Sequence, residues 1–327
     1  GGAGSSVLQN VEIRYPGMSN PGNNDFRDGL LIRGGSSPRL ESVRVREVAS
    51  HGVRVLDGSP VLRGVDVQGA GGVPFYITLN ADPVFDGITA SGNRAEGLWV
   101  DGGNLAAVRE WGVTNMPYMV NSNLVISRGG LLRLKAGVIV KMDRGAYLQS
   151  TGGDGRVEAL GTAGSPVIIT AWADDSAGGD TLRDGSAGNQ AAVPGLWEAI
   201  YLETNSVLQH TEIRYAGMSN PGNNDLRAAV IIRSGASPTL QDVRIRDVAH
   251  HGVRIDTGAP TVDGLDVRRT GREGVPIYMS LAADPVLRRL SGSENGAEGI
   301  WVDGGLLTDA VREWRLTDMP YMLTTNL

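Results

Sequence analysis

The chain has 327 residues, a formal net charge of −6 and no cysteine. The missing cysteines exclude a disulfide framework, and the acidic balance without a basic run argues against nucleic acid as a partner. Hydrophobic residues make up 41% of the chain, enough for a continuous core, yet no apolar run approaches the roughly 18 residues of a membrane-spanning helix.

Residues 1–124 are expected to form short β-strands in a regular cycle. The dipeptides Ser37-Pro38, Ser59-Pro60 and Asp82-Pro83 recur at intervals of 22 and 23 residues. After each proline, aliphatic residues alternate with polar ones, a period-two pattern that indicates a strand, and Gly, Asn and Asp between the runs indicate turns. The alternating residues are Leu40, Val43, Val45, Leu62, Val65, Val67, Phe85 and Ile88, with a second set of Val53, Val55, Leu98 and Val100.

Residues 125–200 occur only once in the chain. Their first part carries the same alternation, which predicts further strands of the same kind. A polar, glycine-rich loop then runs from Asp174 to Gln190, before Trp197. The alternating residues of this part are Leu132, Leu134, Val138, Val140, Met142, Val157, Leu160, Val167, Ile168 and Ile169.

Residues 201–327 repeat the first copy. The segment 207–225 equals 7–25 except at His210, Thr211 and Ala216. The match continues to the last residue, and HGVRV, LWVDGG and MPYM return as HGVRI, IWVDGG and MPYM. Such repetition is typical of solenoids, in which each repeat packs on its neighbours. Because a chemical site is rarely needed twice in one chain, the duplication favours a structural function over catalysis.

The cycle of 22–25 residues predicts an all-β fold, the right-handed parallel β-helix, in which each coil adds one strand to each of three parallel sheets. On the order of 12 to 14 coils are expected. Propeller blades are longer and leucine-rich repeats need a leucine ladder with asparagine, so both fit less well. We expect the copies at 1–124 and 201–327 and the module at 125–200 to form one continuous solenoid.

Four segments in fixed order carry a resemblance to a known family: GGLLRLKAGVIVKM at 129–142, the stretch 157–186, PGLWEAIYL at 194–202 and SVLQHTEIRYAG at 206–217. They resemble bacterial secreted right-handed β-helix proteins of the pectate-lyase-like superfamily, whose modules occur in large repetitive cell-surface and adhesin-like proteins. The resemblance implies an extracellular, cell-surface location, with the signal peptide outside this segment. It implies no single activity, because this fold carries lyases, hydrolases and inert stalks.

Two functions are expected as alternatives. The first is a non-catalytic structural and adhesive rod segment of a larger repetitive protein, whose partners are neighbouring repeats and cell-surface glycans or another cell's surface. The second is a polysaccharide lyase or glycoside hydrolase with a groove along one sheet. An enzyme is expected to have one coil whose polar residues have no counterpart in the other copy. Strand edges at the ends of such a stack also predict end-to-end self-association.

The loop at 174–190 is a candidate calcium site. Oxygen ligands on a glycine-rich loop suit calcium, which accepts six to eight of them in irregular geometry. The competing interpretation is a solvated turn whose aspartates bind backbone amides. The resembled family usually has asparagine where this chain has Leu182, which removes one potential ligand. The candidate ligands are Asp174, Asp175, Asp180, Asp184 and Asn189.

Paired aromatic and acidic residues are candidate carbohydrate-binding groups. Aromatic side chains beside carboxylates are typical of sugar sites, and glycoside hydrolysis needs two carboxylates at a defined separation. The competing interpretation is that these tryptophans pack between coils. The candidates are Trp99, Asp101 and Trp111 in the first copy and Trp301, Asp303 and Trp314 in the second, with Glu110 and Glu313 nearby.

The remaining polar motifs are interpreted as structural. His51 and His251 precede glycines, but Ser50 and His250 stand where hydrolases of this fold have the first glycine of a Gly-His-Gly signature, so both are expected to be turn histidines. Alternating arginines predict a solvated outer face with ion pairs, or a footprint for an acidic polysaccharide. The NPGNND segments at 20–25 and 220–225 are expected to be turn loops, with a cation or recognition loop as the alternative. The alternating arginines are Arg44, Arg46, Arg54, Arg244, Arg246 and Arg254.

Overall fold

The protein is a parallel β-solenoid, as the sequence predicts. Over the described residues it has about 12 turns, every sheet is parallel and no helix is present, so no helix could cross a membrane. The computed structural model describes residues 6–18, 27–185, 192–219, 227–305, 307 and 311–325. Both NPGNND segments and Asn189 lie outside the described residues. Ser219, just before the second segment, is described.

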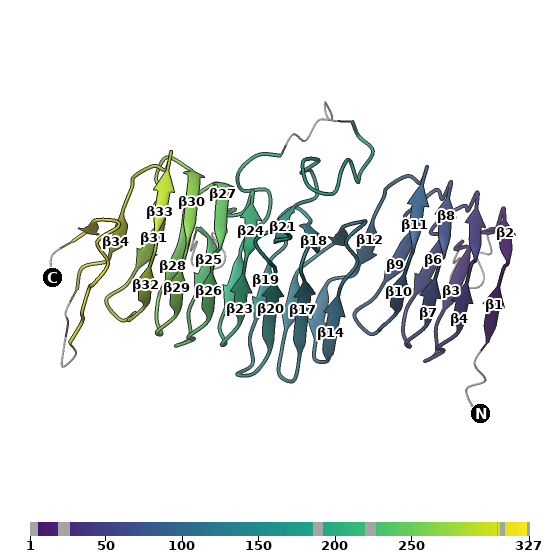
Figure 1. Ribbon diagram of the computed structural model, residues 1–327, viewed down its shortest axis with the longest axis horizontal. Coiled ribbons are helices and arrows are strands. Elements are labelled where there is room, and N and C mark those ends of the chain that lie inside the picture. Colours follow the sequence, from purple (N-terminus) through teal and green to yellow (C-terminus); the bar gives the residue numbers. More distant parts are fainter. Residues whose placement is uncertain are drawn as a thin grey trace. The chain divides into compact units, whose positions relative to one another are not determined.

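The chain forms two compact units. The first comprises residues 1–103, 115–121 and 178–189, and the second comprises 104–114, 122–177 and 190–327. Strand β13 (Gly103–Leu105) straddles the boundary in sequence. Figure 1 shows the parallel strands of each unit stacked coil upon coil.

The first unit contains three parallel sheets, and each coil adds one strand to each of them. The first sheet consists of β1 (Val7–Gln9), β4 (Arg39–Glu41), β7 (Val61–Arg63) and β10 (Val84–Asp86). The second consists of β2 (Glu12–Arg14), β5 (Arg44–Arg46), β8 (Asp66–Gln68) and β11 (Thr89–Ser91). The third consists of β3 (Leu30–Ile32), β6 (Val53–Val55), β9 (Phe75–Ile77), β12 (Leu98–Val100) and β15 (Tyr118–Val120).

The second unit has the same three-sided coil. One sheet consists of β14 (Val108–Trp111), β17 (Leu131–Lys135), β20 (Arg156–Leu160), β23 (Val207–Gln209), β26 (Thr239–Gln241), β29 (Thr261–Asp263) and β32 (Val286–Arg288). Another consists of β18 (Ile139–Met142), β21 (Val167–Ala171), β24 (Thr211–Arg214), β27 (Arg244–Val248), β30 (Asp266–Thr270) and β33 (Ser291–Ser293). The third consists of β16 (Leu124–Ile126), β19 (Leu148–Ser150), β22 (Ile200–Leu202), β25 (Ala228–Ile232), β28 (His251–Ile255), β31 (Ile277–Met279), β34 (Ile300–Val302) and β35 (Tyr321–Leu323).

The core is a set of aliphatic columns inside the coils. Leu40 is paired with Leu62 and Val45 with Val67 in successive coils, and all four side chains are at most 1% exposed. Because strand residues alternate between two faces, their polar neighbours point outward. Identical or similar side chains therefore stack along each unit, which explains the period-two pattern of the sequence.

The corners between coils require glycine at particular positions. Gly58 has φ +84°, and a Cβ atom there would lie 2.1 Å from the Ser36 carbonyl oxygen. Gly258 repeats this arrangement with φ +93° and 2.0 Å to the Ala236 carbonyl oxygen. A side chain fits neither position, because both the backbone conformation and the next coil exclude it. The glycine before each of these Ser-Pro or Ala-Pro corners therefore sets the close stacking of the coils.

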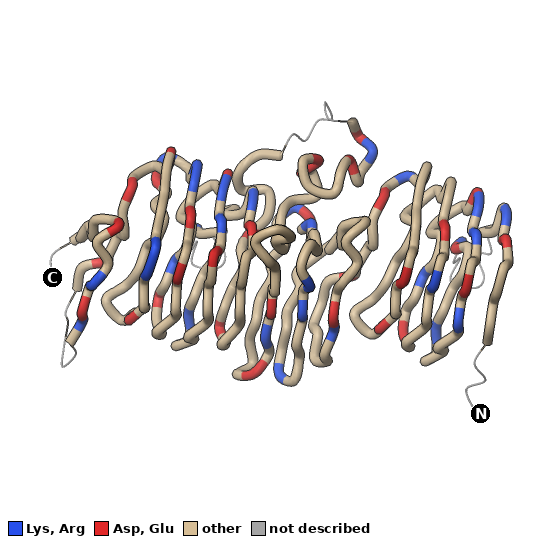
Figure 2. The backbone as a smooth tube through the Cα atoms, viewed as in Figure 1, with Lys and Arg blue, Asp and Glu red and all other residues tan. Residues whose placement is uncertain are grey.

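Acidic and basic residues alternate along the outer faces of the strands. Figure 2 shows them intermixed within each unit, without a long run of one sign. Most of the pairs join residues two apart in one strand or one coil apart, as in Arg39–Glu41 and Arg63–Asp86. The predicted ion-paired outer face is therefore present.

Candidate functional site

Trp99 lies on the outer face of the third sheet of the first unit, in a row with Arg54 and Tyr76. The residues on either side of these three in their strands are buried, so all three point outward. The register places Arg54 beside Tyr76 and Tyr76 beside Trp99. The Arg54 guanidinium lies 4.4 Å from the centre of the Tyr76 ring, within the range of a cation–π contact. We call Arg54, Tyr76 and Trp99, with their counterparts in the second copy, the aromatic ladder.

Asp101 and His51 flank the aromatic ladder. The Tyr76 hydroxyl donates a hydrogen bond to Asp101 Oδ1, and Asn121 Nδ2 donates a second one of 2.8 Å to the same oxygen. The His51 ring lies 4.9 Å from the Tyr76 ring. Coils of 20 to 25 residues bring these groups together from four different turns of the solenoid.

The second unit contains the same ladder. Arg254, Tyr278 and Trp301 lie side by side on β28, β31 and β34, and the Arg254 guanidinium lies 5.0 Å from the Tyr278 ring centre. The Tyr278 hydroxyl donates to Asp303, and the His251 ring stacks on Tyr278 at 4.8 Å. The tryptophan–aspartate pairs that the sequence singles out therefore share one environment in both copies.

Burial shifts the pKa values of the ladder tyrosines and of the histidines that flank them. His51 Nδ1 accepts a hydrogen bond of 3.2 Å from the Val73 amide, so the ring is held in its neutral form, and burial lowers its pKa. Burial, with the nearby Arg254 charge as the next cause, lowers the pKa of His251 to about 4. Burial and the hydrogen bond to Asp303 raise the pKa of Tyr278 to about 12, and the same causes raise that of Tyr76. At neutral pH the histidines and tyrosines are therefore uncharged.

Trp111 and Trp314 take no part in the aromatic ladder. Trp111 ends β14, is 5% exposed and pairs in register with Leu134 of the next coil. Trp314 stacks on Tyr321 at 4.9 Å, and Tyr321 is paired with the buried Ile300, on the opposite face of the sheet from Trp301. The packing interpretation fits Trp111, whereas Trp314 is 38% exposed and is only partly covered by the Tyr321 ring.

Asp174 is engaged by protein groups. Its carboxylate accepts hydrogen bonds from the hydroxyls of Thr170 and Ser176 and forms an ion pair of 3.1 Å with Arg214. The side chain is buried, on the outer face of the sheet that contains β21 and β24. A carboxylate with this many donors, one of them a guanidinium, is poorly suited to a cation.

The other acidic residues of the loop divide between the two units. Asp175 belongs to the second unit, whereas Asp180 and Asp184 belong to the first. Asp180 accepts backbone hydrogen bonds of 3.2 Å from Asp184 and 3.0 Å from Gly185. This is the turn geometry that the competing interpretation predicts, and Asp180 and Asp184 still offer partly exposed oxygens.

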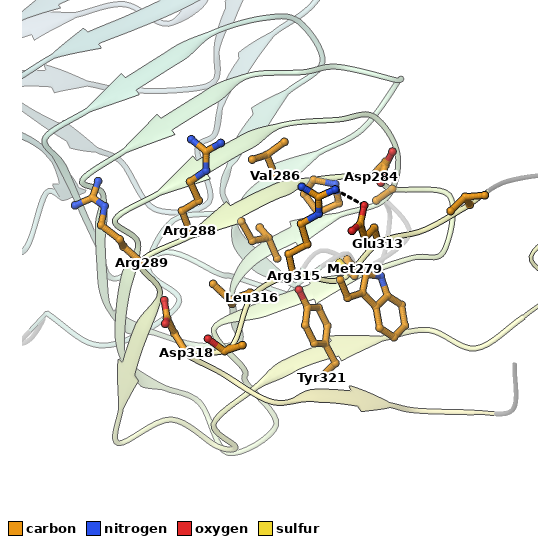
Figure 3. Close-up of a pocket in the computed structure, with 16 residues that line it drawn as sticks. Met279, Asp284, Val286, Arg288, Arg289, Glu313, Arg315, Leu316, Asp318 and Tyr321 are labelled. Atoms are coloured by element: carbon orange, nitrogen blue, oxygen red, sulfur yellow. Dashed lines mark hydrogen bonds and ion pairs between the residues drawn. The ribbon is translucent and has the colours of Figure 1, made fainter.

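A groove of about 670 Å³ lies beside Trp314 in the second unit. Figure 3 shows Arg288 and Arg289 on one side of it and Tyr321 on another, with Arg315 and Glu313 joined as an ion pair. The first copy has Gly112 where the second has Arg315, and Glu110 pairs there with Lys135 of the next coil. The Glu313–Arg315 ion pair is therefore not repeated at the equivalent positions of the first copy, Glu110 and Gly112.

Sequence reasoning found one tryptophan and one aspartate of each ladder and missed their neighbours. It treated His51 and Arg54 as separate motifs and did not consider Tyr76. The signal that could have grouped them is the coil length itself, since Arg54, Tyr76 and Trp99 lie 22 and 23 residues apart.

Comparisons with protein-family models, curated proteins and solved structures find no match to this chain.

Proposed function

We propose that this chain is a non-catalytic structural and adhesive rod segment of a larger repetitive protein at a bacterial cell surface. We place it with the secreted right-handed β-helix proteins of the pectate-lyase-like superfamily. The single observation that carries the proposal is the duplication of the aromatic ladder with the same internal contacts. Arg54, Tyr76 and Asp101 in one copy match Arg254, Tyr278 and Asp303 in the other.

The internal contacts of the ladder argue against catalysis. An acid–base pair needs one group that gives up a proton to substrate and one that accepts it. In the ladder, Asp101 already accepts hydrogen bonds from Tyr76 and Asn121, and His51 Nδ1 accepts from a backbone amide. Such contacts stiffen a stack of coils, which suits a rod.

The half-buried rings of Trp99 and Trp301 supply the adhesive part of the proposal. An outward indole offers an apolar face to a sugar ring, with an aspartate beside it to accept hydrogen bonds from hydroxyls. Cell-surface glycans are therefore the proposed partners. Calcium at the loop 174–190 is proposed as a stabiliser of the fold.

Incubation with neutral and acidic polysaccharides, with and without calcium and from acidic to alkaline pH, tests the proposal. We expect no new reducing ends and no unsaturated products, together with glycan-array binding that Trp99→Ala/Trp301→Ala weakens. Val84→Ala, an exposed apolar residue outside the ladder, is the control and is expected to bind as the wild type does. Cleavage of any polymer would overturn the non-catalytic role in favour of the alternative, a polysaccharide lyase or glycoside hydrolase. Binding that both variants retain would overturn the role of the tryptophans.

A further inference from the structure

A polar groove recurs at equivalent positions of the two copies, on a different sheet from the aromatic ladder. In the first unit it has a volume of about 740 Å³ and lies across β2, β5, β8 and β11. In the second unit, two hollows of about 300 Å³ each lie across β24, β27 and β30, the strands before β33, and share Glu212, Arg244 and Asp266. Figure 1 labels these four strands side by side.

The centre of each groove is a row of acid, arginine and acid on three successive coils. The register pairs Glu12 with Arg44 and Arg44 with Asp66 in the first unit. In the second unit it pairs Glu212 with Arg244 and Arg244 with Asp266. Because adjacent parallel strands lie about 4.8 Å apart, each central arginine stands between two carboxylates.

Both carboxylates in each groove are nevertheless occupied by other residues. In the first unit Arg14 pairs with Glu12, while Arg46 and the Thr89 hydroxyl bind Asp66, both at 2.7 Å. In the second unit the corresponding acids are also engaged, although Arg246 binds Glu212 where its counterpart Arg46 binds Asp66. Arg214 and Arg246 pair with Glu212, and Arg268 and the Ser291 hydroxyl bind Asp266, both at 2.9 Å.

The central arginines of the two grooves are Arg44 and Arg244. Within the described residues, no hydrogen bond or ion pair joins the side chain of Arg44 or Arg244 to another group. Both are exposed. Since each neighbouring acid already has an arginine of its own, the N–H donors of the central guanidinium are open to a ligand. The same arrangement is present in both copies.

We propose that Arg44 and Arg244 anchor two equivalent binding sites for an oxyanion. The oxyanion is a carboxylate or a sulfate group carried by an extended ligand. A guanidinium binds such groups through two parallel N–H···O hydrogen bonds. Ser91 lines the groove of the first unit and offers a hydroxyl to the neighbouring part of the ligand. The open groove admits a chain that continues beyond the anchored group. This inference deepens the adhesive part of the proposed function, because it assigns that part a second ligand chemistry.

Titration calorimetry with short polyglutamate, sulfated dextran and neutral dextran tests the proposal. The intact protein is expected to bind at least one of the two polyanions at two sites and not to bind neutral dextran. Arg44→Gln or Arg244→Gln alone should leave one site of two, and the double variant should lose at least about tenfold in affinity. Binding of polyglutamate alone would identify carboxylate as the ligand group, and binding of sulfated dextran alone would identify sulfate.

The matched control is Arg63→Gln/Arg156→Gln, which removes two exposed arginines from other sheets, one in each unit. It should bind as the intact protein does. Equal losses in the control and in Arg44→Gln/Arg244→Gln, or no binding of either polyanion, would overturn the proposal. Because Arg44 and Arg244 have no partner within the described residues, thermal unfolding of their variants should match the wild type. Failure here leaves the rod role intact, since that role depends on the cleavage and glycan assays.

Discussion

The Arg214 guanidinium lies 3.1 Å from Asp174 Oδ2, and both side chains are less than a tenth exposed. Arg214 also holds Glu212, so one guanidinium joins β24 to the start of the loop that follows β21. The equivalent Arg14 in the first copy pairs with Glu12 and is 60% exposed. The two equivalent arginines are therefore expected to contribute differently to the free energy of unfolding.

Arg214→Met is expected to lower the free energy of unfolding by about 3 to 5 kcal/mol. The substitution leaves the buried Asp174 carboxylate without its cation, which is the costly way to break a buried ion pair, whereas Glu212 keeps Arg246. Urea unfolding followed by circular dichroism measures the change. Arg14→Met is the matched control and should leave the unfolding midpoint unchanged, because an exposed pair contributes little. Similar losses in both variants would contradict this account.

His251 is expected to make the free energy of unfolding depend on pH between the pKa of its imidazole in the folded state and that in the unfolded state. The unfolded imidazole takes up a proton below its ordinary value of 6.5, whereas the folded one does so only at about 4. Between pH 4 and 6.5 the unfolded state therefore binds more protons than the folded state. The contribution of His251 to the free energy of unfolding falls as pH drops from 6.5 to 4, and it is constant above pH 6.5. The loss is on the order of 3 kcal/mol.

Urea unfolding of the wild type and His251→Gln at a series of pH values checks the histidine prediction. The variant should have a flatter profile in that window, because glutamine does not titrate. Other groups titrate in both proteins and cancel in the difference. Parallel profiles would show that His251 does not carry the effect.

Tyr278→Phe is expected to cost about 1 kcal/mol, the usual net value of a hydrogen bond. In this variant Asp303 still accepts a hydrogen bond of 3.3 Å from the Thr324 hydroxyl. Tyr76→Phe in the first copy should cost less, because Asp101 keeps a hydrogen bond of 2.8 Å from Asn121. Thermal unfolding of the two variants compares them directly. A larger loss for Tyr76→Phe would contradict the assigned contacts.

Calcium is expected to raise the midpoint of thermal unfolding, and a chelator to lower it, because an ion bound only by the folded state stabilises that state. Asp180→Asn should abolish the difference. Asp86→Asn, an exposed acid outside the loop, should leave it in place. An unchanged midpoint with and without chelator would remove calcium from the proposed function.

The strands and the core were predictable because each coil repeats the same alternation. Leu40, Val45 and Val53 are buried as the pattern requires. The ion pair of Asp174 was not predictable, since Arg214 lies 40 residues away, beyond a loop with no repeat pattern. The partners of Asp101 were hidden for a different reason. Residues such as Tyr76 share no motif with it in the sequence and meet it only through the coil register.

The second copy has two extra residues between Arg268 and Ile277, compared with the span from Gln68 to Phe75 in the first. Even so, Arg254 reaches Tyr278 much as Arg54 reaches Tyr76. The segment 271–276, between β30 and β31, therefore absorbs a change in chain length without shifting the strands on either side. Insertions and deletions are tolerated where the chain turns and penalised where it stacks. An epitope or a reporter peptide placed in this segment would thus be displayed on the molecule while the solenoid keeps its register.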